Sequence, residues 1–260
     1  MTAERRVLVH PDKQSLTGAA AARFITTVVD LLSGQPLVHV VVTGGSVGIG
    51  VLVSINQSEA RDSVDWSRVH LWWGDERWLA QGDAERNETQ ARTALVVNIA
   101  LPAQNVHPFP SPLKLSDLAG SELDAAAVAY AKELASFAAP GAELPAFDIT
   151  LLGVGPDGHV ASLFPDDAGV QVTDRTVLAV RNSPKPPAER LSLSLSAINS
   201  SCRVWMVLAG DDKAAALGLA LSGADPLTVP VAGVLGAETL FFVDAQAAAN
   251  VPPELISSDS

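Results

Sequence analysis

The sequence has one cysteine among its 260 residues, and other common signals are missing with it. The lone thiol of Cys202 excludes an intrachain disulfide framework and fits a reducing cytosol. We expect this thiol to be buried and inert, because free cysteine is among the most buried residue types. Residues 1–13 contain only a short apolar stretch, too little for a signal-peptide core. The sequence therefore predicts a cytoplasmic protein.

Long hydrophobic runs are scarce as well. The one segment long enough to suggest a membrane span is 37–55, and it contains His39, Thr43, Ser46 and four glycines. A buried strand that turns into a helix explains this segment better. We therefore expect no membrane partner.

Basic side chains are outnumbered, with 17 Lys and Arg against 29 Asp and Glu and a formal charge of −12. Such a surface repels polyanions, which argues against a nucleic-acid partner. Apolar residues make up 48% of the chain and charged residues 18%, a balance that can bury a substantial core. We predict a single domain over residues 1–260, with a frayed tail at 251–260.

Apolar runs without polar alternation, typical of strands buried on both faces of a parallel sheet, alternate with helical patterns rich in Ala and Leu. The predicted strands are 7–9, 37–42, 69–73, 147–152, 176–180, 204–209 and 239–243. The predicted helices are 15–33, 46–56, 84–99, 121–137 and 211–221. Loops are expected at 107–117, 139–146 and 182–189. This alternation predicts an α/β fold with a Rossmann-like, mainly parallel sheet flanked by helices and joined by right-handed crossovers.

The first segment with chemical character is VVVTGGSVG at residues 40–48, where an apolar strand breaks at Gly44 and Gly45. A helix pattern follows, with Ser46 as its capping candidate. Such a turn presents backbone N–H groups at the positive end of a helix dipole, with no Cβ to block a phosphate. The spacing matches neither the dinucleotide fingerprint nor the Walker loop. A bare β-to-α turn without a ligand is the alternative.

The second segment is WWGDERW at residues 72–78, where a buried strand ends in three charges. Ligands of open α/β sheets bind at the carboxyl ends of the strands. Arg77 can grip an anion bidentately, and Asp75 can hold Arg77 in place or accept a sugar hydroxyl. A surface ion pair without a ligand is the alternative.

The third segment, DITLLGVGPDGHVASLFP at residues 148–165, delivers His159 from a glycine-rich loop after an apolar strand. A neutral imidazole can take a proton from water, and Asp157 can orient the ring. A lone histidine with a structural role is the alternative.

The fourth segment, NSPKPPAERLSL at residues 182–193, places Lys185 and Arg190 on a proline-rich loop. A stiff loop lowers the entropy lost when a side chain clamps an anion. Solvated loop charges are the alternative. Lys213, at the start of a predicted helix after a strand, is a further cation candidate.

Together these segments resemble the 6-phosphogluconolactonase family, part of a larger group that includes glucosamine-6-phosphate deaminase, ribose-5-phosphate isomerase and CoA transferases. The resemblance runs from Gly44 to Arg190 and implies the Rossmann-like fold of that group. It also implies hydrolysis of 6-phospho-D-glucono-1,5-lactone in the oxidative pentose phosphate pathway, with no metal and no cofactor. The expected partner is this small-molecule substrate, and the protein is expected to be a monomer or a small homo-oligomer.

The resemblance implies that His159 is the general base for the attacking water, and we place Asp157 with it in the catalytic pair. The substrate-binding candidates are Gly44, Gly45, Ser46, Asp75, Arg77, Lys185, Arg190 and Lys213.

Two departures from the family pattern exist. Trp78 and Leu79 stand where the family usually has a Val-Pro-like pair, and Arg86-Asn87 replaces a Ser-Asn pair, which leaves the role of Asn87 open. A glucosamine-6-phosphate deaminase is one alternative, but its Asp-Gly-His loop typically continues into Asn-Glu-Pro, unlike residues 161–165 here. A non-catalytic sugar-phosphate sensor is the other alternative.

Overall fold

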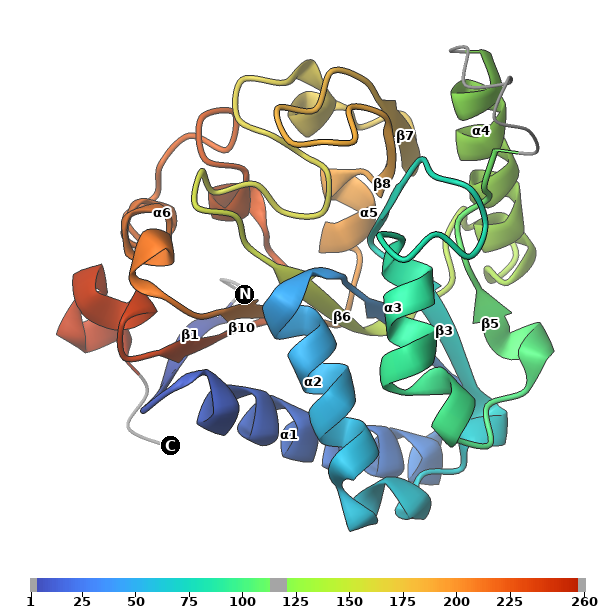
Figure 1. Ribbon diagram of the computed structural model, residues 1–260, viewed down its shortest axis with the longest axis horizontal. Helices are drawn as coiled ribbons and strands as arrows, with labels where there is room; N and C mark the ends of the chain where they lie inside the picture. The colour runs from blue at the N-terminus through green and yellow to red at the C-terminus, as the bar shows by residue number, and fades with distance from the viewer. Residues whose placement is uncertain (1–3, 113–120, 257–260) are drawn as a thin grey trace.

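The computed structural model describes residues 4–112 and 121–256 (Figure 1). Its centre is a seven-stranded sheet in which every neighbouring pair is parallel. In spatial order the strands are β1 (Glu4–His10), β10 (Glu238–Asp244), β9 (Arg203–Leu208), β6 (Phe147–Gly153), β2 (Val38–Val42), β3 (Val69–Trp73) and β5 (Val106–His107). The predicted Rossmann-like α/β fold is confirmed.

A second, antiparallel sheet of three short strands lies beside the main sheet, in the order β4 (Asp75–Arg77), β8 (Arg190–Leu193) and β7 (Val177–Val180). The strand predicted at 176–180 therefore exists, but it belongs to this small sheet. β4 was missed because its three residues are all charged, and β5 was missed because it has two residues only.

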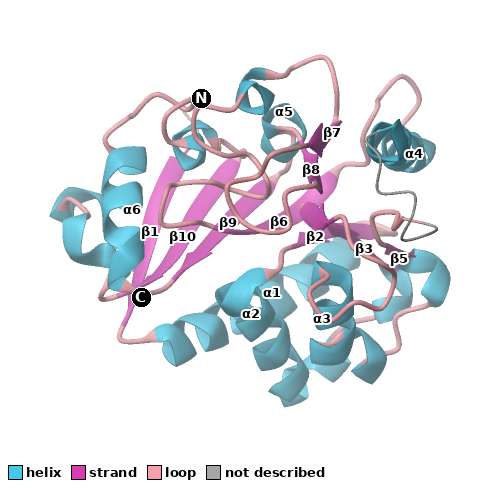
Figure 2. Cartoon of the chain, turned by 45° about the horizontal axis from the view of Figure 1, so that its top comes forward, coloured by secondary structure: helices cyan, strands magenta, loops and turns pink. Residues whose placement is uncertain are grey.

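Three helices lie side by side on one face of the main sheet: α1 (Lys13–Gly34), α2 (Gly45–Gln57) and α3 (Asn87–Ala94) (Figure 2). By length and composition α1 could cross a membrane, but its buried stripe, which includes Phe24 and Val28, belongs to the hydrophobic core. The segment 37–55 forms β2, a turn and most of α2, as expected.

The remaining helices are α4 (Ser121–Ser136), which packs on β7 and β8, the short α5 (Leu195–Asn199), and α6 (Ala214–Leu221). Two predicted helices are shorter than expected and pair with 3-10 turns. The region 84–99 becomes α3 and a turn at Val96–Asn98, and 211–221 becomes a turn at Asp211–Lys213 and α6.

The order of the strands reverses between β2 and β6. From β2 the chain winds outward to β3 and β5, whereas from β6 it winds the other way to β9 and β10. At such a switch point the connections leave the sheet in opposite directions and open a crevice at the carboxyl ends of the strands. The fold therefore places a site beyond the ends of β2 and β6.

One local prediction is corrected: Cys202 is exposed, because it lies just before β9 begins. At the start of the expected tail Val251 is buried, a 3-10 turn spans Pro253–Leu255, and Ile256 forms a bridge with Val7. The frayed tail at 251–260 stays a prediction. The rest of the expected tail, 257–260, lies outside the described residues, as does 113–117 of the loop predicted at 107–117.

Three histidines stack between the sheet and α4. His70 Nδ1 lies 3.0 Å from His107 Nε2, and His107 Nδ1 lies 2.8 Å from Glu133 Oε1. Trp72 Nε1 donates to His39 Nδ1 at 3.1 Å. Burial, aided by the charges of the neighbouring histidines, lowers the pKa of His39 to about 4, and burial likewise lowers the pKa of His70. The folded protein therefore disfavours protonation of His39 and His70.

The lowered pKa of His39 should make stability depend on pH. The folded pKa of His39 is about 4 and the reference pKa is 6.5, so its contribution is full above pH 6.5 and is lost as the pH falls toward 4. For His39 alone the loss is about 3 kcal/mol at most. His39→Gln keeps an acceptor for Trp72 and should flatten the fall of the unfolding free energy across this window, measured by urea denaturation. An equally steep fall in the variant would contradict this role of His39.

Candidate active site

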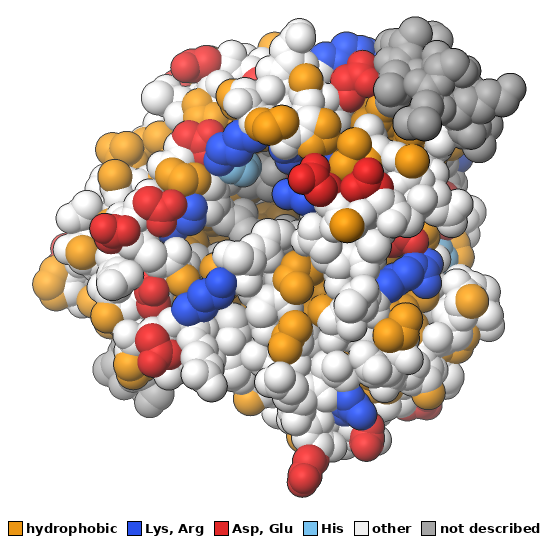
Figure 3. Space-filling model, in the orientation of Figure 1, with side chains coloured by type: hydrophobic (Ala, Val, Ile, Leu, Met, Phe, Trp, Pro, Cys, Tyr) orange, Lys and Arg blue, Asp and Glu red, His pale blue; other side chains and the backbone are white. Residues whose placement is uncertain are grey.

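A cavity of about 230 Å³ lies at the carboxyl ends of β2, β3, β6 and β9, four neighbouring strands. In the space-filling view it is a hollow with Lys, Arg and His side chains at its rim (Figure 3). Nine of the ten predicted site residues line it: Gly44, Gly45, Ser46, Asp75, Arg77, His159, Lys185, Arg190 and Lys213. The tenth, Asp157, contacts His159. The structure therefore brings residues from all four predicted segments into one cavity.

The chain passes from β2 into α2 through a tight glycine turn. Gly45 begins α2 with a φ of 76°, in the left-handed region that favours glycine. A Cβ on Gly44 would lie 1.9 Å from Oδ1 of Asn87, so this close approach also requires glycine. Gly44, not Ser46, is the N-cap residue, and Ser46 lies exposed inside the first turn. The capping prediction for Ser46 is therefore wrong.

The amino terminus of α2 is suited to an anion. Gly44 offers no capping side chain, and the first turn contains no acidic residue. The first four N–H groups of a helix have no partner within the helix, and the helix dipole makes this end positive. Since the turn lines the cavity, these donors are available to a ligand there.

Asp75 holds two other elements in place and does not pair with Arg77. Its Oδ2 accepts from Ser162 Oγ at 2.7 Å, and its Oδ1 accepts from Asn87 Nδ2 at 3.2 Å. Arg77 instead donates from Nη1 to the carbonyl oxygen of Glu85. The expectation that Asp75 holds Arg77 is wrong, because Asp75 is buried against α3 and the His159 loop. Asn87, whose role the sequence left open, lines the cavity and joins Gly44 to Asp75.

Glu76 is a buried neighbour of the site that was not predicted from the sequence. Its carboxylate is 1% exposed and accepts backbone N–H bonds from Arg77 at 2.8 Å, Asn87 at 2.7 Å and Glu88 at 2.9 Å. Arg86 Nη2 lies 3.6 Å from it. Burial raises the pKa of Glu76, and the charge of Arg86 and the three N–H groups oppose that rise. Glu76 thus caps α3 from a distant strand and fixes Asn87 at the cavity.

His159 and Asp157 form a close pair. His159 Nδ1 lies 2.5 Å from Asp157 Oδ1, and Lys185 Nζ lies 3.3 Å from the same Nδ1 and 3.6 Å from Asp157 Oδ1. Burial favours a raised pKa for Asp157, but the hydrogen bond and charge of His159, with the charge of Lys185, hold that pKa well below its usual range. An ionised carboxylate only accepts, so Nδ1 carries the hydrogen of this bond, and in the neutral imidazole the lone pair then lies on Nε2.

Glycines make room for this pair. A Cβ on Gly155 would lie 2.0 Å from both Nδ1 and Cε1 of His159, so only glycine fits beneath the ring. Gly158 has a φ of 82°, and Ala161 has a φ of 50°, unusual for a residue with a side chain. The close contacts and the left-handed φ values therefore fix the path of the loop after β6, which carries His159 into the cavity lining.

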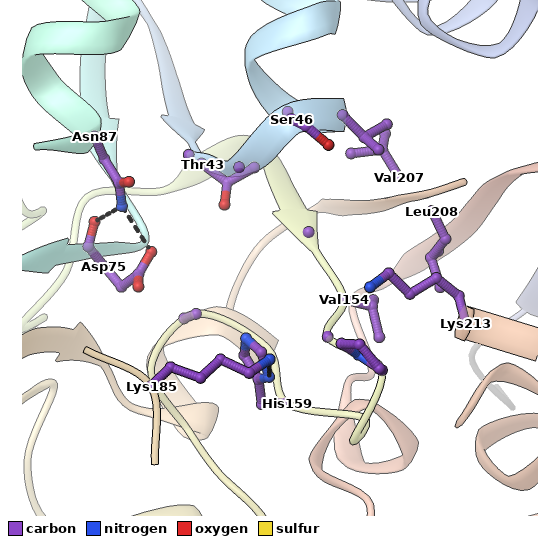
Figure 4. A pocket seen from close by; sticks show the side chains of 18 of the residues that line it. Thr43, Ser46, Asp75, Asn87, Val154, His159, Lys185, Val207, Leu208 and Lys213 are labelled. Carbon is purple, nitrogen blue, oxygen red and sulfur yellow. Dashed lines mark hydrogen bonds between the residues drawn. The ribbon is translucent and has the colours of Figure 1, made fainter. Parts of the chain in front are cut away.

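The cations lie at two sides of the cavity. Figure 4 shows Lys185 beside His159, across the cavity from Ser46, while Lys213 points inward from the other side. Lys213 Nζ also donates to Asp212 at 2.8 Å. Arg190 is buried and directs two nitrogens at backbone carbonyls of the loop that carries Lys185.

Several lining residues carry no charge and were not predicted: Thr43, Val154, Pro156, Ala161, Val207 and Leu208. The last two end β9, the neighbour of β6. Knowing the order of the strands would have identified these two residues, but sequence patterns alone do not predict that β9 lies next to β6. Within residues 4–112 and 121–256, no group of three His, Cys, Asp or Glu side chains could hold a metal ion. The expected absence of a metal and a cofactor stays a prediction.

Comparisons with known proteins agree across nearly the whole chain. A family model described as "Glucosamine-6-phosphate isomerases/6-phosphogluconolactonase" matches residues 11–242. A 6-phosphogluconolactonase of Streptomyces coelicolor is 49% identical over 254 residues, with 96% of each chain covered. That of Mycobacterium tuberculosis is 43% identical, with 94% of this chain and 97% of the relative covered.

Solved structures are similar as well. The 6-phosphogluconolactonase of Trypanosoma brucei has a TM-score of 0.84 at 26% identity, with 96% of this chain and 100% of that chain covered. A monomeric glucosamine-6-phosphate deaminase has a TM-score of 0.77 at 17% identity, with 94% and 99% covered, a likeness of fold alone.

The switch-point cavity on a parallel sheet defines a Rossmann-like α/β protein with a site for a small ligand. The chain belongs to the family of glucosamine-6-phosphate isomerases and 6-phosphogluconolactonases. Within that family it is an enzyme of the lactonase branch, which confirms the resemblance drawn from the four segments.

Glu76→Gln tests the buried cap of α3. The change removes the charge opposite Arg86 and turns an amide N–H toward the backbone N–H groups of the helix. We expect the unfolding free energy in urea at neutral pH to fall by about 2–3 kcal/mol. Glu85→Gln, at an exposed position of the same segment, should change it by less than about 0.5 kcal/mol. Similar small losses in both variants would contradict the capping role.

Proposed function

We propose that this chain hydrolyses 6-phospho-D-glucono-1,5-lactone to 6-phospho-D-gluconate in the oxidative pentose phosphate pathway. The observation that carries the proposal is the meeting of an anion-ready helix terminus and a His-Asp pair in one cavity. The Streptomyces and Mycobacterium relatives, at 43–49% identity, are named 6-phosphogluconolactonases.

The phosphate end of the substrate fits the α2 side of the cavity. Backbone N–H groups after Gly44 and Gly45 offer directed donors, and Ser46 adds a hydroxyl group. Arg77 and Lys213 also line the cavity and supply positive charge. In a protein with a formal charge of −12, this local set of cations and N–H groups gives the anion a favourable place to bind.

His159 is the general base of the proposed reaction. Nε2 accepts a proton from water as the water oxygen attacks the lactone carbon, and Asp157 stabilises the imidazolium through Nδ1. The attack turns the carbonyl into a tetrahedral oxyanion. When the ring C–O bond then breaks, the ring oxygen leaves as the hydroxyl of the open-chain acid and takes its proton from the imidazolium.

The acceleration required is modest, because a δ-lactone is an activated ester that already opens in water. A positioned base supplies about a hundred- to ten-thousand-fold. A preorganised donor or cation at the oxyanion supplies a factor of about a hundred to a thousand. Lys185, whose ammonium group lies beside the His-Asp pair, is the cation placed to meet charge near that carbon. No acyl-enzyme is needed.

The two rival functions make different demands. A deaminase would release ammonia from glucosamine 6-phosphate, and the chain lacks the Asn-Glu-Pro continuation expected after its Asp-Gly-His loop. A non-catalytic sensor would need no base, whereas His159 is oriented by Asp157 and given room by Gly155. A single domain over 1–260, a cytoplasmic location and a monomeric or small homo-oligomeric state stay predictions.

The direct test is hydrolysis of freshly generated 6-phosphogluconolactone, corrected for spontaneous opening. His159→Ala should lower kcat at least about a hundredfold and leave substrate affinity nearly unchanged, because the ring acts on water. His10→Gln, a histidine outside the cavity lining, serves as the matched control and should keep full turnover.

Unchanged turnover in His159→Ala would remove the base from the proposal. Absence of turnover in the unsubstituted protein would contradict lactonase activity itself. In that case, ammonia release from glucosamine 6-phosphate would favour the deaminase, and a thermal shift with 6-phosphogluconate alone would favour the sensor.

A further inference from the structure

Arg190 begins β8 and lies against the loop that carries Lys185. Nη2 donates to the carbonyl oxygens of Lys185 and Pro186, both at 3.1 Å, and Nε donates to that of Pro187 at 3.2 Å. The side chain is 6% exposed. One guanidinium group therefore binds three successive carbonyls, and two of its three nitrogens are engaged within the protein.

The guanidinium group of Arg190 also contacts Phe164, whose ring contacts the proposed base, His159. Arg190 Cζ lies 5.7 Å from the ring centroid of Phe164, within the range of a cation–π contact. Phe164 is 2% exposed, and its ring centroid lies 4.7 Å from that of His159. Phe164 thus lies in contact with both the guanidinium and the imidazole.

These contacts suit arginine specifically. Its planar group presents five donors in a fixed fork, whereas a lysine ammonium is a compact charge that cannot span three carbonyls while facing a ring. Without the guanidinium group, the partly buried carbonyl oxygens of 185–187 would lose their hydrogen-bond donors, and the loop would be free to move. The position of Lys185 relative to His159 would then no longer be fixed.

We infer that Arg190 is a positioning residue, which holds Lys185 and His159 in the relative positions that the reaction needs, and is not a ligand of the substrate phosphate. This inference rests on the proposed lactonase function and deepens it. The phosphate depends instead on the α2 terminus with Arg77 and Lys213. Arg190 and Arg77 are cross-strand partners in the small sheet. The inference thus assigns different tasks to two adjacent arginines.

The test compares Arg190→Lys with Arg77→Lys. Arg190→Lys should lower kcat at least tenfold while the inhibition constant of 6-phosphogluconate changes less than threefold. Arg77→Lys should raise that inhibition constant at least tenfold. Arg181→Lys is the matched control, since Arg181 pairs with Asp124 outside the cavity lining, and it should change neither quantity.

A double variant separates positioning from general destabilisation. If Arg190 acts through the Lys185 loop, adding Arg190→Lys to Lys185→Met should cost less than it does alone, because residues that act as a unit are not additive. Multiplicative losses would overturn this link. So would a tenfold rise in the inhibition constant of 6-phosphogluconate in Arg190→Lys, which would make Arg190 an anion ligand.

Hydrogen exchange gives a readout that needs no turnover. The amide of Ser183 donates to Ala188 O and that of Lys185 to Ser183 Oγ. Arg190→Lys should speed exchange in residues 183–189, and unchanged exchange would overturn the inference even if the unsubstituted protein proved inactive as a lactonase.

Should Arg190→Lys not fold, Phe164→Leu tests the contacts that join Arg190 to His159. We expect this variant to have a lower kcat and an unchanged inhibition constant for 6-phosphogluconate. Unchanged kcat there would contradict the link through Phe164.

Discussion

The parallel pairing of β2 with β6 is the constraint on which the site depends. It places the Gly44 turn, which ends one strand, against the start of the loop that ends the other. A Cβ on Gly153 would lie 3.9 Å from Gly44 O, so the two backbones approach within ordinary contact distance. Because the sheet order reverses at this pair, the two loops border the cavity at the carboxyl ends of the strands. The glycine turn at the start of α2 and the His159-Asp157 pair lie at one cavity for this reason.

Buried carboxylates organise the rest of the site. Glu76 caps α3 and fixes Asn87, and Asp75 joins Asn87 to Ser162 in the loop that carries His159. Both acids accept hydrogen bonds from protein groups, and four cations line the cavity: Arg77, Lys185, Arg190 and Lys213. A chain with a strongly negative formal charge thus has a pocket in which cations outnumber acids.

Much of the fold and the site could be predicted from local sequence. Strands such as β2 and β6 read as apolar runs, and the glycine breaks after them marked the loops that line the cavity. Elements whose signal is not local were missed. β4 is a strand of charged residues held by β8, and Glu76 acts by capping a helix that begins eleven positions later. Cys202 was misplaced because residue type is a weak guide to exposure at a strand end. The partner of Asp75 depends on tertiary contacts that spacing alone does not reveal.

In the proposed function one small molecule spans the cavity, with its phosphate at the α2 terminus and its reacting carbon at His159. A crystal structure with bound 6-phosphogluconate measures this directly. We expect phosphate oxygens to accept from backbone N–H groups at Gly45 and Ser46, and the product carboxylate to lie within hydrogen-bond reach of His159 Nε2. A product bound with its phosphate at His159, or outside the cavity, would contradict the account.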